Sequence, residues 1–225
     1  MEEKVYTPKV NINNRNLSVA VFALYFSWLL AFPFEGQILY SLADFHQVSP
    51  HEFIFGAIAV HFAGLFLCGF FIKEMRTAKR LMLVAIAFSI LASAVFFFHP
   101  SILWTIAIIT SSFLAGGLVA AWGFYFKEYT PKNERIKTAA DVLIYSNILM
   151  IALNMVAIHL SPHLGLGLSI IVLGAALKCV LQLPEKSDNV IHSTSKNTED
   201  TVSIMNCPLS SRQPKKKKWY YWTLS

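Results

Sequence analysis

Cysteine is scarce in this chain. The 225 residues include only 3 cysteines, and Cys68, Cys179 and Cys207 stand far apart, with no C-x-x-C pair and no metal-ligand partner beside them. This spacing gives no sign of a cysteine-based metal centre, and nothing in it requires an oxidising compartment. We expect Cys68 and Cys179 to act as small apolar residues within helices and Cys207 to be a thiol in a polar tail.

The usual sequence signs of an enzyme or a DNA-binding protein are also missing. The chain has no nucleophile–base pair, no glycine-rich phosphate loop and no H-E-x-x-H, and its 7 histidines are scattered. The polar segments are too short for a helix-turn-helix. We therefore expect no enzymatic activity, no metal, no cofactor and no direct nucleic-acid binding.

Long apolar runs dominate what is present, since 55% of the residues are hydrophobic. A run of roughly 18 or more apolar residues is long enough to cross the hydrocarbon core of a bilayer, which is about 30 Å thick. The sequence predicts an all-α polytopic membrane protein with six spans, at about 17–40, 52–72, 81–98, 102–126, 138–160 and 164–183.

The connectors between the runs alternate in charge. Lysine and arginine gather before the first run, at 73–80 and in 124–138 (FYFKEYTPKNERIKT), whereas 41–51, 99–101 and 161–163 contain neither. Short loops rich in Lys and Arg stay in the cytoplasm. We therefore expect both termini to be cytoplasmic, and the net charge of +6 needs no nucleic acid to explain it. The two tight turns divide the spans into two groups of three, as in inverted repeats.

Three segments follow from this organisation. Residues 1–16 form a cytoplasmic N-terminal segment, 17–184 a six-helix bundle and 185–225 a polar tail without apolar periodicity, which is expected to be disordered. The tail ends in four lysines and WYYWTLS at 215–225, and two interpretations stay open. The end is a peripheral membrane anchor, or it is the frameshifted end of a longer protein, because consecutive lysine codons are prone to slippage.

Glu35 is the clearest candidate for a functional group inside the membrane. A carboxylate there costs on the order of 3 kcal/mol, so it is expected to face protein or a water-filled cavity. Tyr25, Trp28 and Phe32 recur with Glu35 at helical spacing, which predicts one face lining a central cavity. Glu35 is either a proton- or substrate-binding acid or a residue close enough to the surface to reach water.

Other polar residues lie within the predicted spans. His61 is a candidate partner of Glu35 or a hydrogen-bonded packing residue. Asn147 and Asn154 share a face of the fifth span and are expected to bind solute or to hydrogen-bond between helices. Asp141 is expected to lie within reach of cations in the inner loop.

Small and helix-breaking residues predict local packing. Pro33 and Gly36 are expected to loosen the first span around Glu35. Small residues four apart let helix backbones approach closely, and we interpret them as packing within the bundle rather than as a dimer face. The pairs are Gly64–Cys68, Gly116–Ala120 and Gly117–Ala121.

The connector after the fourth span resembles one in a known family. Glu128, Pro131 and Arg135 form E-x-x-P-x-x-x-R, which is similar to the loop after the fourth helix of major facilitator superfamily transporters. Ile136 stands where a glycine often follows the arginine. Together with the six spans, this resemblance covers about residues 17–185.

The connector after the second span resembles the family less closely. Gly69 followed by Lys79 and Arg80 is similar to the G-x-x-x-D-R-x-G-R-R loop, with Lys73 at the aspartate position and Arg76 at the second glycine. The resemblance implies the amino-terminal half of a facilitator fold, with a 3+3 inverted repeat and gating roles for both loops. It also implies alternating-access movement of a small solute together with a second copy or a second six-helix half.

A narrower likeness concerns residues 133–154, NERIKTAADVLIYSNILMIALN. This stretch resembles the membrane region of bacterial LuxR-type regulators, which implies the bacterial inner membrane and ligand sensing instead of transport. Two functions stay open: a half-length transporter, with Glu35, His61 and Asn154 contacting solute, and a sensing domain or truncated fragment of such a regulator. A gene remnant that still inserts and folds is a third possibility.

Overall fold

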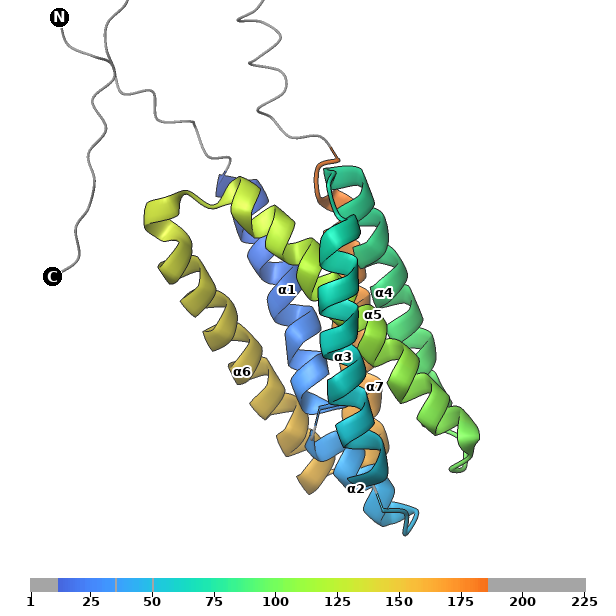
Figure 1. Ribbon diagram of the computed structural model, residues 1–225. Coiled ribbons are helices and arrows are strands. Elements are labelled where there is room, and N and C mark those ends of the chain that lie inside the picture. Colours follow the sequence, from blue (N-terminus) through green and yellow to red (C-terminus); the bar gives the residue numbers. More distant parts are fainter. Residues whose placement is uncertain (1–11, 35, 50, 186–225) are drawn as a thin grey trace, which may run out of the picture. The chain divides into compact units, whose positions relative to one another are not determined.

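The computed structural model describes residues 12–34, 36–49 and 51–185, and in this part the chain is all-helical (Figure 1). The described helices belong to one compact unit. They are α1 (Ile12–Ala31), α2 (Gln37–Phe45), α3 (His51–Phe71), α4 (Met75–Val95), α5 (Ile102–Tyr129), the 3-10 turn η1 (Lys132–Glu134), α6 (Arg135–His159) and α7 (Pro162–Gln182). The tail predicted from residue 186 onward lies outside the described residues.

Five of the described helices are long and apolar enough to cross a membrane: α3, α4, α5, α6 with η1, and α7. Their apolar windows have mean hydropathies between 1.8 and 2.2. Many large apolar side chains on these helices point outward, among them Phe62, Phe66 and Phe70 on α3 and Ile144 and Ile148 on α6. Such a surface is unusual for a protein surrounded by water and suits one surrounded by lipid.

The first predicted span, 17–40, is not one continuous helix. Helix α1 ends at Ala31, and α2 begins only at Gln37 after a turn. Pro33 has no backbone N–H, and its ring clashes with the carbonyl four residues earlier, so a helix cannot pass through it undisturbed. The N–H of Phe34 bonds instead to the carbonyl oxygen of Leu29, at 3.1 Å. The expected loosening around Pro33 and Gly36 is confirmed, and it takes the form of a complete helix break. Helix α1 is not among the five candidate spans.

The predicted basic loop at 73–80 is also wrong in extent. Helix α4 begins at Met75, so Arg76, Lys79 and Arg80 lie in its first turns. Long basic side chains can extend from a helix end toward the polar boundary, which lets the helix include them. Most remaining boundaries agree with the predicted spans to within three residues, a difference expected for helix ends.

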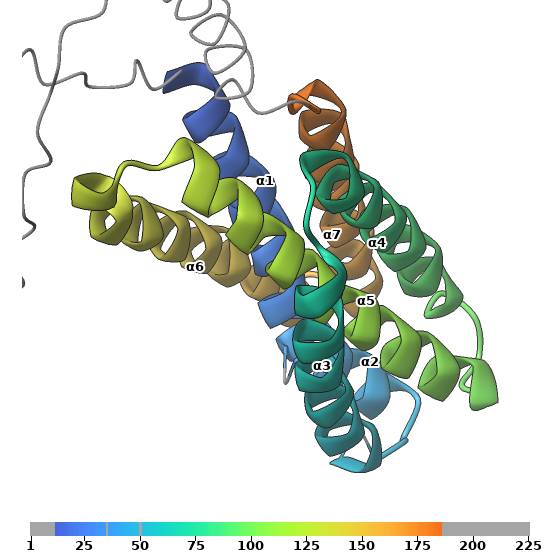
Figure 2. The same cartoon turned by 45° about the horizontal axis from the view of Figure 1, so that its top comes forward.

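The long helices pack in a regular set of pairs. Helix α3 lies along α5 and α6 along α1, while α4 packs on α5 and α7 on α1. Further contacts join α4 to α7, α6 to α7 and α1 to α5, and α2 packs on α6 and α7. Figures 1 and 2 both show α6 running beside α1, with α2 at the end of the bundle where α6 finishes.

The α3–α5 pair is the closest packed, and glycines make this possible. A Cβ built on Gly64 would overlap the carbonyl oxygen of Phe113, and one on Gly116 would overlap the carbonyl oxygen of His61. The two backbones therefore touch where both side chains are missing. The interpretation of these small residues as packing positions inside the bundle is confirmed.

Candidate functional site

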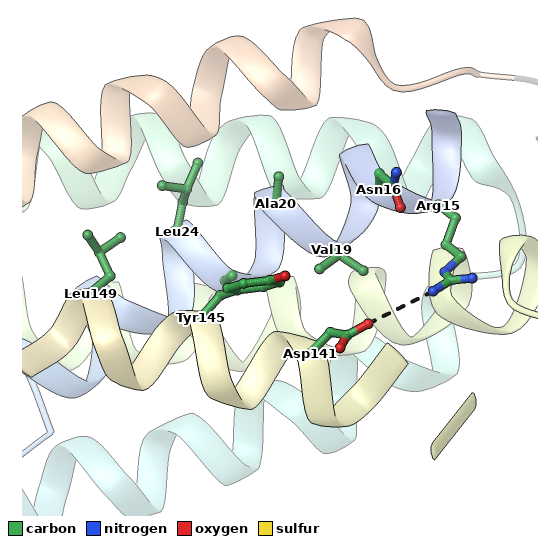
Figure 3. A pocket seen from close by; sticks show the side chains of 9 residues that line it. Arg15, Asn16, Val19, Ala20, Leu24, Asp141, Tyr145 and Leu149 are labelled. Atoms are coloured by element: carbon green, nitrogen blue, oxygen red, sulfur yellow. Dashed lines mark ion pairs between the residues drawn. The ribbon is translucent and has the colours of Figure 1, made fainter. Parts of the chain in front are cut away.

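An open groove lies between α1 and α6, with a volume of about 470 Å³ (Figure 3). Volumes of this order hold small organic molecules. The groove is lined by Arg15, Asn16, Val19, Ala20, Ala23 and Leu24 of α1 and by Asp141, Tyr145 and Leu149 of α6.

Helical spacing explains why these residues share one surface. Asp141, Tyr145 and Leu149 are four residues apart, so they form a single row along α6. The α1 side of the groove includes Ala20 and Ala23, whose side chains are short. Figure 3 shows that ring between Asp141 and Leu149, along the groove. The walls are thus mainly apolar, with a polar end.

Arg15 forms the polar end together with two carboxylates. Its guanidinium pairs with Glu134 of η1, and its second amino group lies 3.9 Å from Asp141. That second distance exceeds hydrogen-bonding range, so the Asp141 contact is electrostatic only. The side chains of Arg15, Glu134 and Asp141 are 17%, 41% and 33% exposed, respectively. The expected cation for Asp141 therefore comes from the start of α1 rather than from the inner loop.

The predicted cavity-lining face of the first helix is instead packed inside the bundle. The side chains of Tyr25, Trp28 and Phe32 are at most 2% exposed. The Tyr25 hydroxyl lies 3.1 Å from Ser89 Oγ, and Trp28 Nε1 donates to Ser93 Oγ at 3.0 Å, so both bond to α4. Helical spacing shows that residues share a face, but not which neighbour covers that face. The cavity-lining prediction is wrong for these three residues.

Glu35, the fourth member of that face, lies outside the described residues. His61 is buried on α3, and the Phe34 ring packs edge-on against it at a centroid distance of 4.8 Å. Within the described part of the chain, His61 Nδ1 has no hydrogen-bond partner. His61 does not line the α1–α6 groove, and its pairing with Glu35 stays a prediction.

The two asparagines of α6 also lie away from the groove lining. Asn147 is exposed, and its side-chain amide donates to the Leu143 carbonyl of the same helix at 2.7 Å. Asn154 is half-buried, with its Oδ1 unpaired among the described residues. The expected hydrogen bonds between helices are therefore not formed by Asn147, and solute contacts by either residue stay a prediction.

The E-x-x-P-x-x-x-R connector shapes the turn between α5 and α6. Arg135 donates to the carbonyl oxygens of Lys127 at 3.3 Å and Thr130 at 3.4 Å, which caps the end of α5. Pro131 precedes η1, and Glu128 is half-buried in the last turn of α5. The turn also contains Glu134, which pairs with Arg15 of α1. The connector therefore contributes to the polar end of the groove.

Lys79 caps the end of α7, as Arg135 caps the end of α5. Its buried ammonium group donates to the carbonyl oxygens of Leu181 at 3.1 Å and Leu183 at 2.7 Å, and forms an ion pair of 3.4 Å with Glu185. The last carbonyls of a helix have no intrahelical partner and carry partial negative charge. Lys79 thus joins the start of α4 to the end of α7.

Gly69 and Arg80, the other residues of the second-span connector, lie on the exposed surface. A Cβ added at Gly69 would meet nothing within 4 Å. Both positions are remote from the groove lining, and their expected gating role stays a prediction.

Several groove residues escaped the sequence prediction. Arg15 and Asn16 were assigned to the polar segment before the first span, yet they belong to the first turns of α1. Tyr145 was not among the predicted site residues. A usable signal was present: Arg15 and Asp141 are opposite charges at the same ends of two predicted spans.

The described residues contain no group of three or more histidine, cysteine, aspartate or glutamate side chains arranged to hold a metal ion. No family model, curated protein or solved structure matches this chain.

Proposed function

We propose that this chain is an integral membrane protein that binds a small solute in the α1–α6 groove and moves it as a half-length, facilitator-type transporter. The groove is the observation that carries the proposal. It combines apolar walls with a few convergent polar groups at one end, the arrangement that small-molecule sites generally have.

The pairing of the helices supports this architecture. Exchanging α1, α3 and α4 for α5, α6 and α7 converts the α3–α5 pair into α6–α1 and the α4–α5 pair into α7–α1. The α1–α5 and α4–α7 pairs are converted into themselves. The α6–α7 pair breaks the pattern, because α3 and α4 do not pack together to a comparable extent. The other pairs follow the pattern that two inverted repeats of three helices would produce.

The two repeats differ where the groove lies. At the α3–α5 crossing, Gly64 and Gly116 bring the backbones into contact and leave no room. At the equivalent α1–α6 pair, the helices also pack together, but they leave an open groove that Arg15, Asp141 and Tyr145 line. This asymmetry favours a binding role for the α1–α6 side and a supporting role for the α3–α5 side.

Alternating access requires two walls that move relative to each other around one site. A single bundle provides one of these walls. The proposal therefore includes a second copy of this chain, or a separate six-helix half, as the opposing wall.

The test compares wild-type protein with a variant whose groove is filled. Proteoliposomes would be incubated with a defined mixture of amino acids, amines, sugars, carboxylates and flat aromatic compounds, and their contents measured by mass spectrometry. We expect at least one compound to accumulate with the wild type and to be lost with Ala20→Phe, because the larger side chain occupies the groove. The control is Ala59→Phe, an exposed position on α3. Equal accumulation with Ala20→Phe and wild type would contradict the proposal.

Ligand sensing is the second candidate, and one observation favours it. Residues 133–154, which resemble the membrane region of LuxR-type regulators, contain the whole α6 wall of the groove: Asp141, Tyr145 and Leu149. A compound that binds the wild type and not Ala20→Phe, but that never accumulates in proteoliposomes, would favour sensing over transport.

A further inference from the structure

We propose that the groove takes an amphipathic organic cation: an ammonium or guanidinium group, held by Asp141, on a flat apolar body. This inference rests on the proposed role of the groove as the solute site. It adds the chemical class of the solute, for which the charges and the shape of the groove give the argument.

The charges at the polar end favour a cation. In the described part of the chain, Glu134 and Asp141 share one basic partner, Arg15, so the group carries one excess negative charge. Arg15 forms its close contact with Glu134, whereas Asp141 lies 3.9 Å away and accepts no hydrogen bond from it. Asp141 therefore has acceptor capacity left for a donor on the solute.

The same charges disfavour an anionic solute. An anion that paired with the guanidinium of Arg15 would compete there with Glu134 and Asp141, because the one Arg15 nitrogen without a partner among the described residues, Nε, is buried. A displaced carboxylate would lose its basic partner in a partly buried site. Leaving a charge unpaired in such surroundings is costly. A cation bound to Asp141 leaves the Arg15–Glu134 pair intact.

The rest of the groove fits a flat apolar body. Tyr145 presents its ring beside Asp141 (Figure 3), and Val19, Ala20, Ala23 and Leu24 of α1 also line the groove. The Tyr145 side chain is 58% exposed, so the ring is accessible. Aromatic rings stack on flat apolar groups and attract nearby cations through the ring face.

The test uses the full chain in detergent micelles and three probes with the same ring: 2-naphthylmethylammonium, 2-naphthalenemethanol and 2-naphthoate. Affinities would be measured by isothermal titration calorimetry at neutral pH. We expect the ammonium to bind about tenfold more tightly than the alcohol, the factor that one charge-assisted hydrogen bond provides. The naphthoate should bind most weakly.

Variants distinguish the role of each charge. Asp141→Asn should remove the advantage of the ammonium over the alcohol, and Arg15→Gln should strengthen ammonium binding, because Asp141 loses its competing cation. Tyr145→Leu, at an exposed position, should weaken all three probes without changing their order. The control is Asp44→Asn, exposed on α2, which should change nothing.

The outcomes separate this inference from the proposed function. Tightest binding of the naphthoate, an ammonium advantage that persists in Asp141→Asn, or weaker ammonium binding in Arg15→Gln would overturn the cation inference and leave the groove as a solute site. The cation inference also fails, and the solute site remains, if no naphthalene probe binds but accumulation of another compound in proteoliposomes is lost with Ala20→Phe. If no compound at all is sensitive to Ala20→Phe, both proposals fail.

Discussion

At the scale of single residues, the buried lysine of α4 shows how a charge can serve the fold. Lys79 is 8% exposed, yet its ammonium hydrogens are directed at two backbone carbonyls and one carboxylate around the end of α7. Tyr125 of α5 donates to the neighbouring Pro184 carbonyl at 2.9 Å. Three helices thus meet at this point, and the polar groups there satisfy one another.

We predict that Lys79→Met lowers the free energy of unfolding by about 2 kcal/mol, because the carbonyl oxygens of Leu181 and Leu183 lose a charged donor and the bond to Leu183 is buried. Unfolding in mixed micelles by increasing SDS would measure this change. The matched control is Arg80→Met, the exposed neighbour, which should shift the free energy by no more than about 0.5 kcal/mol. Equal effects of the two substitutions would show that Lys79 has no capping role.

At the scale of helices, the bundle depends on how closely α3 approaches α5. The approach is set at Gly116, where the nearest atoms of α3 are backbone atoms of His61, Gly64 and Leu65. Backbone cannot move aside as a flexible side chain can, so any added carbon forces the helices apart.

We expect Gly116→Ala to lower the free energy of unfolding by about 2 kcal/mol through this separation. Gly123→Ala is the control on the same helix, where a Cβ meets nothing within 4 Å. That change should be neutral or stabilising by up to about 1 kcal/mol, because alanine favours helix more than glycine does. The same SDS titration distinguishes the two, and a stable Gly116→Ala protein would contradict the packing argument.

Comparison of these elements with the sequence shows where prediction succeeds. Apolar runs predict five of the long helices, and small residues four apart predict the α3–α5 contact, because both depend on local pattern alone. The environments of the Tyr25 and Trp28 side chains could not be predicted, since these side chains bond to Ser89 and Ser93 of another helix. The groove was missed for the same reason: it exists only where α1 and α6 meet.

At the scale of the whole molecule, the two ends of the described bundle differ in chemistry. One end holds the start of α1, the start of α4 and the α5–α6 connector, which lie at the top of Figure 1. Arg15 belongs to the first turns of α1 and Lys79 to those of α4. At the other end, His46 lies 5.8 Å from His99 and 6.4 Å from His163 between ring centroids. The connectors that carry these histidines contain no lysine or arginine. This difference in basic residues between the two ends is expected of a chain that crosses a bilayer several times.

The most direct test of membrane threading is the labelling of single cysteines on opposite ends. Cys68, Cys179 and Cys207 would be replaced by alanine, and Ser49→Cys and Asn133→Cys introduced separately at exposed positions. With a membrane-impermeant maleimide, we predict that Ser49→Cys reacts in intact cells and that Asn133→Cys reacts only after permeabilisation. Reaction of both cysteines from the same side would contradict the threaded bundle, and the transport and sensing proposals would fail with it.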